Sequence, residues 1–100
     1  MGWADGAIVA LKARKTVCIK PHGNSMLPRI KSGQEVTIQP YDPKLDPPLK
    51  KGDVVLVKVN GTVYLHLVKG MNMGSVLIGN NKGRINGWTD SHNVYGKADI

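Results

Sequence analysis

The sequence of 100 residues contains no phenylalanine, a single cysteine and no long apolar run. Because aromatic residues make up only 5% of the chain, a core must be filled mainly by Val, Ile and Leu, which suit β-strands. The lone Cys18 cannot form an internal disulfide, which fits a reducing compartment. Its apolar neighbours predict a small buried hydrophobe rather than a reactive thiol.

Membrane insertion and secretion are also disfavoured. No stretch approaches the roughly 18 apolar residues of a membrane helix, and the N-terminus does not resemble a secretion signal. We therefore expect a soluble, cytoplasmic protein of one domain.

The charge is strongly basic, with 14 Lys and Arg against 7 Asp and Glu, a formal net charge of +7. These residues are spread along the chain rather than gathered in a stripe, which favours a solvated surface and leaves nucleic-acid binding as the lesser alternative. The three histidines, His22, His66 and His92, lack metal-ligand spacing. We expect no metal and no cofactor.

The residue patterns predict a mainly β fold of short, mostly antiparallel strands. Residues 1–15 form a helical or extended N-terminal segment, with apolar positions at helical spacing over residues 3–14, and residues 16–100 form the β-domain. Strands are expected at 16–20, 35–39, 53–59, 62–68 and 75–79, with a short closing strand at Val94-Tyr95. The proline-rich residues 40–49 and the Asn- and Gly-rich residues 80–92 are expected to be loops.

The clearest local signal is Asn60-Gly61 between two β-rich runs, the preferred pair for a two-residue hairpin turn. This turn would pair Val55 with His66. It would also place Asp53 diagonal to His66 on the same face. An imidazole can act as a general base near neutral pH, but an isolated histidine on a strand is more often structural.

A second signal is the run Gly23-Asn24-Ser25-Met26-Leu27-Pro28. A serine hydroxyl becomes a good nucleophile only beside a base, and a nearby glycine lets a substrate backbone approach closely. The backbone N–H groups of Asn24, Ser25 and Met26 could form an oxyanion hole at this turn. On these local grounds alone, a plain turn serine is the commoner alternative.

Several segments, in order, resemble those of a known clan. The run 23–28 resembles the Gly-x-Ser-Met-x-Pro nucleophile box of the clan that holds LexA-like repressor peptidases and type I signal peptidases. Residues 51–55 are similar to its Gly-Asp-x-Val strand start. Residues 64–68 are similar to its base-bearing strand, in the histidine form of archaeal and endoplasmic-reticulum signal peptidases. Residues 79–82 and 90–96 are similar to its two C-terminal boxes, so the resemblance covers about residues 16–98.

The resemblance implies a Ser-His dyad. Ser25 would be the nucleophile and His66, 41 residues later, the general base. A substrate would lie as an extended strand near Ile19, Pro21 and Gly23. Asn80 stands where the signal peptidase box has an acid, so Asp90 or Asp53 would orient His66.

Gln34, Leu67 and Asn80 depart from the pattern of the clan. We also expect the membrane anchor of signal peptidases and the DNA-binding domain of the repressors to be absent. These departures support an alternative, a catalytically inactive member that binds a protein partner, such as a small regulatory or phage-encoded inhibitor. In either case the expected partner is a peptide or a protein.

Overall fold

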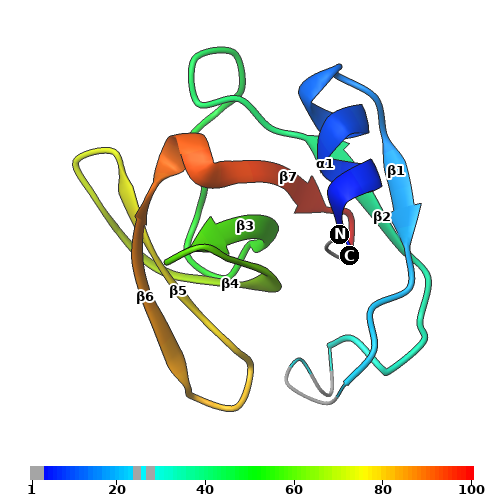
Figure 1. The fold of residues 1–100 in the computed structure, drawn as a ribbon. Coiled ribbons are helices and arrows are strands. Elements are labelled where there is room, and N and C mark those ends of the chain that lie inside the picture. Colours follow the sequence, from blue (N-terminus) through cyan, green and yellow to red (C-terminus); the bar gives the residue numbers. More distant parts are fainter. Residues whose placement is uncertain (1–3, 24–25, 27–28) are drawn as a thin grey trace.

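The computed structural model describes residues 4–23, 26 and 29–100, which form a mainly β domain with one short helix (Figure 1). The described strands make one seven-stranded sheet in which every neighbouring pair is antiparallel. The elements are α1 (Asp5–Lys12), β1 (Val17–Ile19), β2 (Val36–Pro40), β3 (Val54–Val59), β4 (Thr62–Asn72), β5 (Ser75–Gly79), β6 (Ile85–Asp90), the 3-10 helix η1 (Ser91–Asn93) and β7 (Val94–Ala98). The predicted fold class and the short N-terminal helix are confirmed.

The sheet order is β1-β2-β7-β3-β4-β5-β6, so the last strand of the chain lies between β2 and β3. In Figure 1, β7 runs from the side formed by β4, β5 and β6 to the side formed by α1, β1 and β2. The sheet curls until β6 approaches the β3–β4 hairpin. There the Thr89 hydroxyl donates to the Lys58 carbonyl at 2.9 Å.

The hairpin predicted around Asn60-Gly61 is confirmed. Asn60 and Gly61 both have positive φ, 49° and 82°, as the favoured two-residue hairpin turn requires. Val55 lies opposite His66, as the turn predicted. The second strand of this hairpin is longer than expected, because β4 continues past residue 68 to Asn72 and pairs with β5.

The expectation that residues 80–92 form a loop is wrong, because this stretch contains β6. Its composition of Asn and Gly is typical of turns, yet the strand pairs with the strongly apolar β5, with one register shift at Asn86. Gly87, which lies beside the Val59 side chain of β3, has a φ of 133°, a backbone conformation that favours glycine. Tertiary pairing therefore overrides the local composition.

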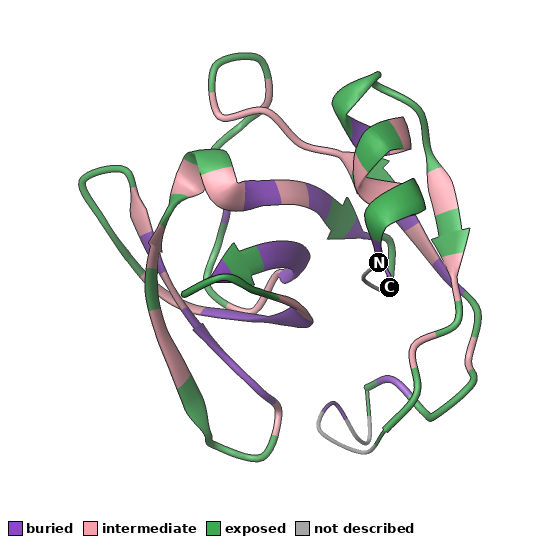
Figure 2. Ribbon diagram, viewed as in Figure 1, coloured by how far each residue is buried: buried purple, intermediate pink, exposed green. Residues whose placement is uncertain are grey.

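The two faces of the sheet pack two separate apolar clusters, and Figure 2 shows buried residues along β3, β4, β5 and β7. One cluster lies beneath α1 and includes Leu11, Ile38, Val54 and Leu56. The other fills the curled part of the sheet and includes Val55, Val57, Val68 and Ile78. Successive residues of β3 thus point into different cores, as the alternation of a strand requires.

The prediction that Cys18 is buried is wrong. Cys18 is exposed, whereas its neighbours Val17 and Ile19 pack against the core. The reason is that β1 pairs with β2 at the margin of the sheet, so alternate side chains of this short strand face outward.

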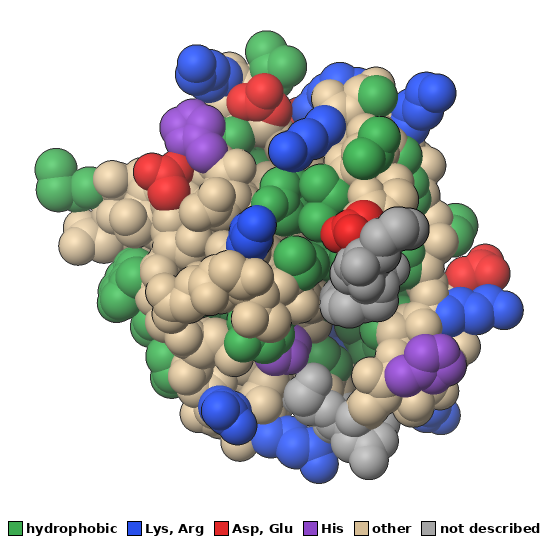
Figure 3. All heavy atoms as spheres, in the orientation of Figure 1, with side chains coloured by type: hydrophobic (Ala, Val, Ile, Leu, Met, Phe, Trp, Pro, Cys, Tyr) green, Lys and Arg blue, Asp and Glu red, His purple; other side chains and the backbone are tan. Residues whose placement is uncertain are grey.

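Within the described residues, no helix has the length and apolar character needed to cross a membrane. On the face shown in Figure 3, Lys and Arg side chains are scattered around the molecule and do not form one stripe.

Candidate active site

A cavity of about 560 Å³ opens between the end of β1 and the middle of β4. It is lined by residues 19–23, by residues 63–66, and by Met26 and Ile30. Several of these side chains also belong to the core beneath α1, so the cavity reaches from the surface to the apolar interior. An apolar hollow with a few polar groups is the usual form of a binding site.

His66 is the most deeply placed titratable group of this cavity, with 8% of its surface exposed. It projects from β4 opposite Val55, and the ring of Tyr64 stacks on it with centroids 4.9 Å apart. Burial lowers the pKa of His66 below its ordinary value of 6.5, because an imidazolium would lose solvation, and a hydrogen bond to Asn86 partly opposes this effect. The lowered pKa favours the neutral ring, the form in which it can accept a proton.

The Nδ1 atom of His66 lies 2.9 Å from Oδ1 of Asn86 on β6. An amide oxygen can only accept a hydrogen bond, so this contact is a hydrogen bond when Nδ1 carries a proton. Sequence reasoning missed Asn86, because the residue falls in the stretch expected to be a loop. Only the pairing of β6 with β5 could have drawn attention to it.

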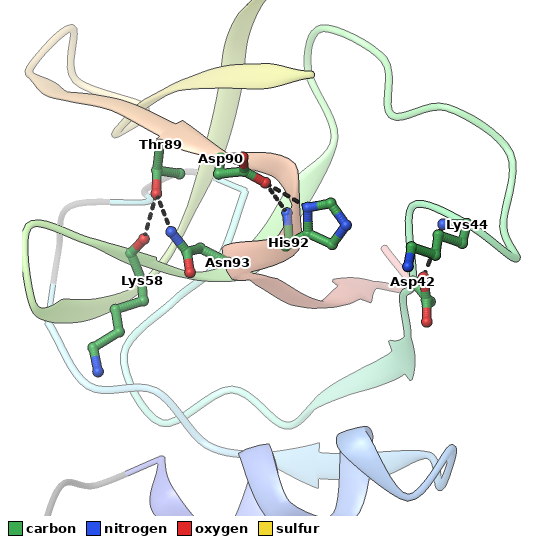
Figure 4. Close-up of polar contacts among 7 residues, drawn as sticks. All are labelled: Asp42, Lys44, Lys58, Thr89, Asp90, His92 and Asn93. Atoms are coloured by element: carbon green, nitrogen blue, oxygen red, sulfur yellow. Dashed lines mark hydrogen bonds and ion pairs between the residues drawn. The ribbon is translucent and has the colours of Figure 1, made fainter.

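The two carboxylates expected to orient His66 have other partners. Asp53 accepts from the Lys50 backbone at 2.8 Å and lies 3.5 Å from the Lys97 ammonium. Asp90 accepts from the backbone and ring of His92 at 2.8 and 2.7 Å, and Figure 4 shows its side chain directed toward that residue. These contacts lower the pKa of Asp90 below its ordinary value, chiefly through the backbone N–H of His92. The Nδ1 atom of His66 is thus held by Asn86 and not by Asp53 or Asp90.

Asn80, which stands where an acid was expected, shapes the turn between β5 and β6. Its Oδ1 accepts from the backbone N–H groups of Lys82 and Arg84 at 2.9 and 3.0 Å, and the side chain is largely buried. This turn leads directly into the strand that carries Asn86. Asn80 therefore helps to position Asn86 by holding the backbone of the turn that precedes β6.

The segment that carries the candidate nucleophile is described in part. Ser25 and Asn24 lie outside the described residues, whereas Gly23 and Met26 on either side of them both line the cavity. Gly23 has a φ of 116°, a conformation that favours glycine, and its N–H donates to the Ser32 hydroxyl at 3.1 Å. Met26 is 5% exposed, and its carbonyl accepts from Ile30 at 3.0 Å. Met26 belongs to the core beneath α1.

The three residues expected near a substrate, Ile19, Pro21 and Gly23, all line the cavity. In the described part of the chain, β1 pairs with β2 alone, so the other edge of β1 faces away from the sheet. The Pro21 carbonyl accepts from Gly33 at 2.8 Å, which ties the residues after β1 to the loop before β2.

Two of the departures from the motif pattern have structural roles. Leu67 is 6% exposed and belongs to the core beneath α1, where an arginine would be buried. Gln34 accepts from the Lys31 backbone at 3.0 Å and closes a local turn. Neither substitution places a new charged group at the cavity.

Comparison with known protein families gives a match over most of the chain. Residues 3–93 match the family model described as Peptidase S24-like. No curated protein matches the chain.

Proposed function

The chain belongs to the Peptidase S24-like family, and from this we propose that it is a serine endopeptidase in which Ser25 and His66 form the catalytic dyad. The observation that carries the proposal is the shared cavity. His66 lines it from β4, and Met26, which is bonded to Ser25, lines it from the facing segment. Gly23, two residues before Ser25 in the sequence, lines the same cavity.

In the proposed reaction the Ser25 hydroxyl attacks the carbonyl carbon of the scissile peptide bond. His66 takes the hydroxyl proton and then gives it to the leaving amine. Water hydrolyses the resulting ester, with His66 again accepting and returning a proton. The lowered pKa of His66 supports this role, because a neutral imidazole is required at the first step.

The proposed substrate is a protein segment in extended form. An extended peptide could add to the outer edge of β1 through backbone hydrogen bonds. Ile19, Pro21 and Gly23, which line the cavity, would then contact its side chains. The oxyanion would be held by backbone N–H groups of the turn, that of Ser25 among them.

The test is labelling by a fluorophosphonate probe, which reacts with activated serines. We expect the wild type to be labelled, and both Ser25→Ala and His66→Ala to lose labelling by about a hundredfold or more. Two matched controls should keep the labelling: His92→Ala removes a histidine of η1, outside the cavity, and Ser91→Ala removes a serine of the same short helix.

Folding of each variant is checked by circular dichroism. If wild type, Ser25→Ala and His66→Ala are all folded and react alike, the dyad is refuted. The chain would then be a family member that binds a protein without cleaving it.

A further inference from the structure

We propose that Asn86 is the positioning residue of the base: it holds His66 in the tautomer with the proton on Nδ1 and so assigns the accepting lone pair to Nε2. The catalytic consequence rests on the proposed function, but the tautomer itself does not. The two carboxylates expected at Nδ1, Asp53 and Asp90, are engaged elsewhere. An uncharged amide oxygen takes their place at 2.9 Å.

Neighbouring side chains contact the imidazole ring of His66 on several sides. Tyr64 stacks on it at an interplanar angle of 22°, and Asn86 reaches it from β6, two strands away in the sheet. Only 8% of His66 is exposed, so bulk water has little access to it. In such a site the hydrogen bond at one nitrogen decides which nitrogen carries the proton.

The difference between an amide and a carboxylate has a chemical consequence. A carboxylate at Nδ1 would stabilise the imidazolium by charge, whereas an amide oxygen offers only a dipole. A base supported by Asn86 therefore stays neutral, and competent to accept a proton, at more acidic pH than one supported by an aspartate. The cost is weaker stabilisation of the imidazolium formed during the reaction.

Other charged and titratable groups surround the site without replacing Asn86. They are Lys20, His22 and Tyr64 on the cavity, Arg84 at the start of β6, and Asp53 beside β3, whose carboxylate is occupied by Lys50 and Lys97.

The test is nitrogen NMR of the intact protein labelled with ¹⁵N-histidine, with His66 assigned by comparison with His22→Gln and His92→Gln. At pH 7.5 we expect the His66 Nδ1 signal to be that of a protonated nitrogen and the Nε2 signal that of an unprotonated one. If Nδ1 is the unprotonated nitrogen, the amide presents its NH₂ group to the ring and the proposal is overturned.

Three variants separate positioning from packing. Asn86→Leu keeps similar bulk but removes the acceptor, and we expect mixed tautomers and a loss of fluorophosphonate labelling of about tenfold to a hundredfold. Asn86→Asp keeps the acceptor and adds a charge, which should retain the tautomer and raise the pKa of His66 by about one unit or more. Asn72→Asp adds the same charge at the far end of β4, about 20 Å along the strand from His66. This control variant should change neither the tautomer nor the pKa of His66.

The outcomes distinguish this inference from the proposed function. If the tautomer and the effects of the Asn86 variants on it are found but the wild type is not labelled, the positioning role stands and the peptidase function falls. If the wild type is labelled but Asn86→Leu changes neither tautomer nor pKa, the positioning role is refuted and the dyad stands. Should Asn86→Leu fail to fold, the wild-type tautomer and the shift in Asn86→Asp still decide the matter.

Discussion

Tyr64 and His66 stack ring on ring, 4.9 Å between centroids, although they are two residues apart on one strand. Such residues share a face of a strand and lie about 7 Å apart along it, so the two rings must lean toward each other. Tyr64 thereby covers one face of the imidazole, and the cavity walls and Asn86 enclose much of the rest. This enclosure is the physical cause of the lowered pKa of His66.

The lowered pKa predicts how stability depends on pH. The unfolded chain takes up a proton at His66 near its ordinary pKa of 6.5, whereas the folded protein resists protonation until lower pH. The unfolded state binds more protons in this window, so stability falls as pH falls below about 6.5, by at most about 1.4 kcal/mol per pH unit. Urea unfolding at several pH values between 7.5 and 5 measures this change in the free energy of unfolding.

The matched comparison is His66→Gln against His22→Gln, since His22 is exposed. The first variant should flatten the pH dependence, and the second should leave it as in the wild type. Above pH 5 the carboxylates with lowered pKa, Asp46 and Asp90, stay ionised and do not contribute. A wild-type profile that is already flat over this range would contradict the prediction.

Gly96 of β7 has no room for a side chain. A Cβ atom there would lie 2.5 Å from Cγ2 of Ile38 and 3.1 Å from Cδ1 of Leu11. We expect Gly96→Ala to lower the free energy of unfolding by about 1–3 kcal/mol, because the sheet and α1 must separate to admit the methyl group. Urea denaturation with a fluorescence readout measures the change.

Gly6→Ala is the control for Gly96→Ala. Gly6 lies inside α1, and a Cβ atom there would meet nothing within 4 Å, so alanine should raise stability by about 0.5–1 kcal/mol. Equal effects at the two positions would mean that α1 does not pack closely on β7.

Asn80 supports the site through the turn before β6. Asn80→Ala would leave the N–H groups of Lys82 and Arg84 without their acceptor, and we expect a loss of about 1–3 kcal/mol in stability. The same variant should weaken the His66–Asn86 hydrogen bond, seen as a change in the His66 ring nitrogen signals. Asn80→Asp restores the acid of the related motif and keeps the acceptor. This variant should therefore retain both the stability of the wild type and the His66–Asn86 hydrogen bond. Identical stability of Asn80→Ala and wild type would refute this role.

Much of the fold could be predicted from the order of the residues along the chain. Asn60-Gly61 specified its hairpin because few residue pairs fit two consecutive positive φ angles, and the register followed by counting from the turn. That register placed His66 opposite Val55. The matches around Ser25 and His66 indicated the family, which the family model confirms over residues 3–93. These signals are local, or depend only on spacing along the chain.

The partners of His66 could not be obtained in this way. The spacing of Asp53 and the motif position of Asp90 suggested a carboxylate, but Lys50 and Lys97 occupy one and His92 the other. Asn86 lies in a stretch whose composition indicates a loop. It becomes a strand residue because its neighbours Ile85 and Gly87 pair with the apolar β5, and Asn86 lies at the register shift between these two pairs.

The sequence by itself determined a β-domain, its central hairpin and the residues that mark the proposed dyad, because turn chemistry and alternation act between near neighbours. Only the tertiary structure decided what surrounds the histidine. The curl of the sheet brings β6 back toward the β3–β4 hairpin, and an amide from one strand meets an imidazole from another. Such a contact depends on the summed twist and packing of several strands, and no short pattern along the chain encodes it.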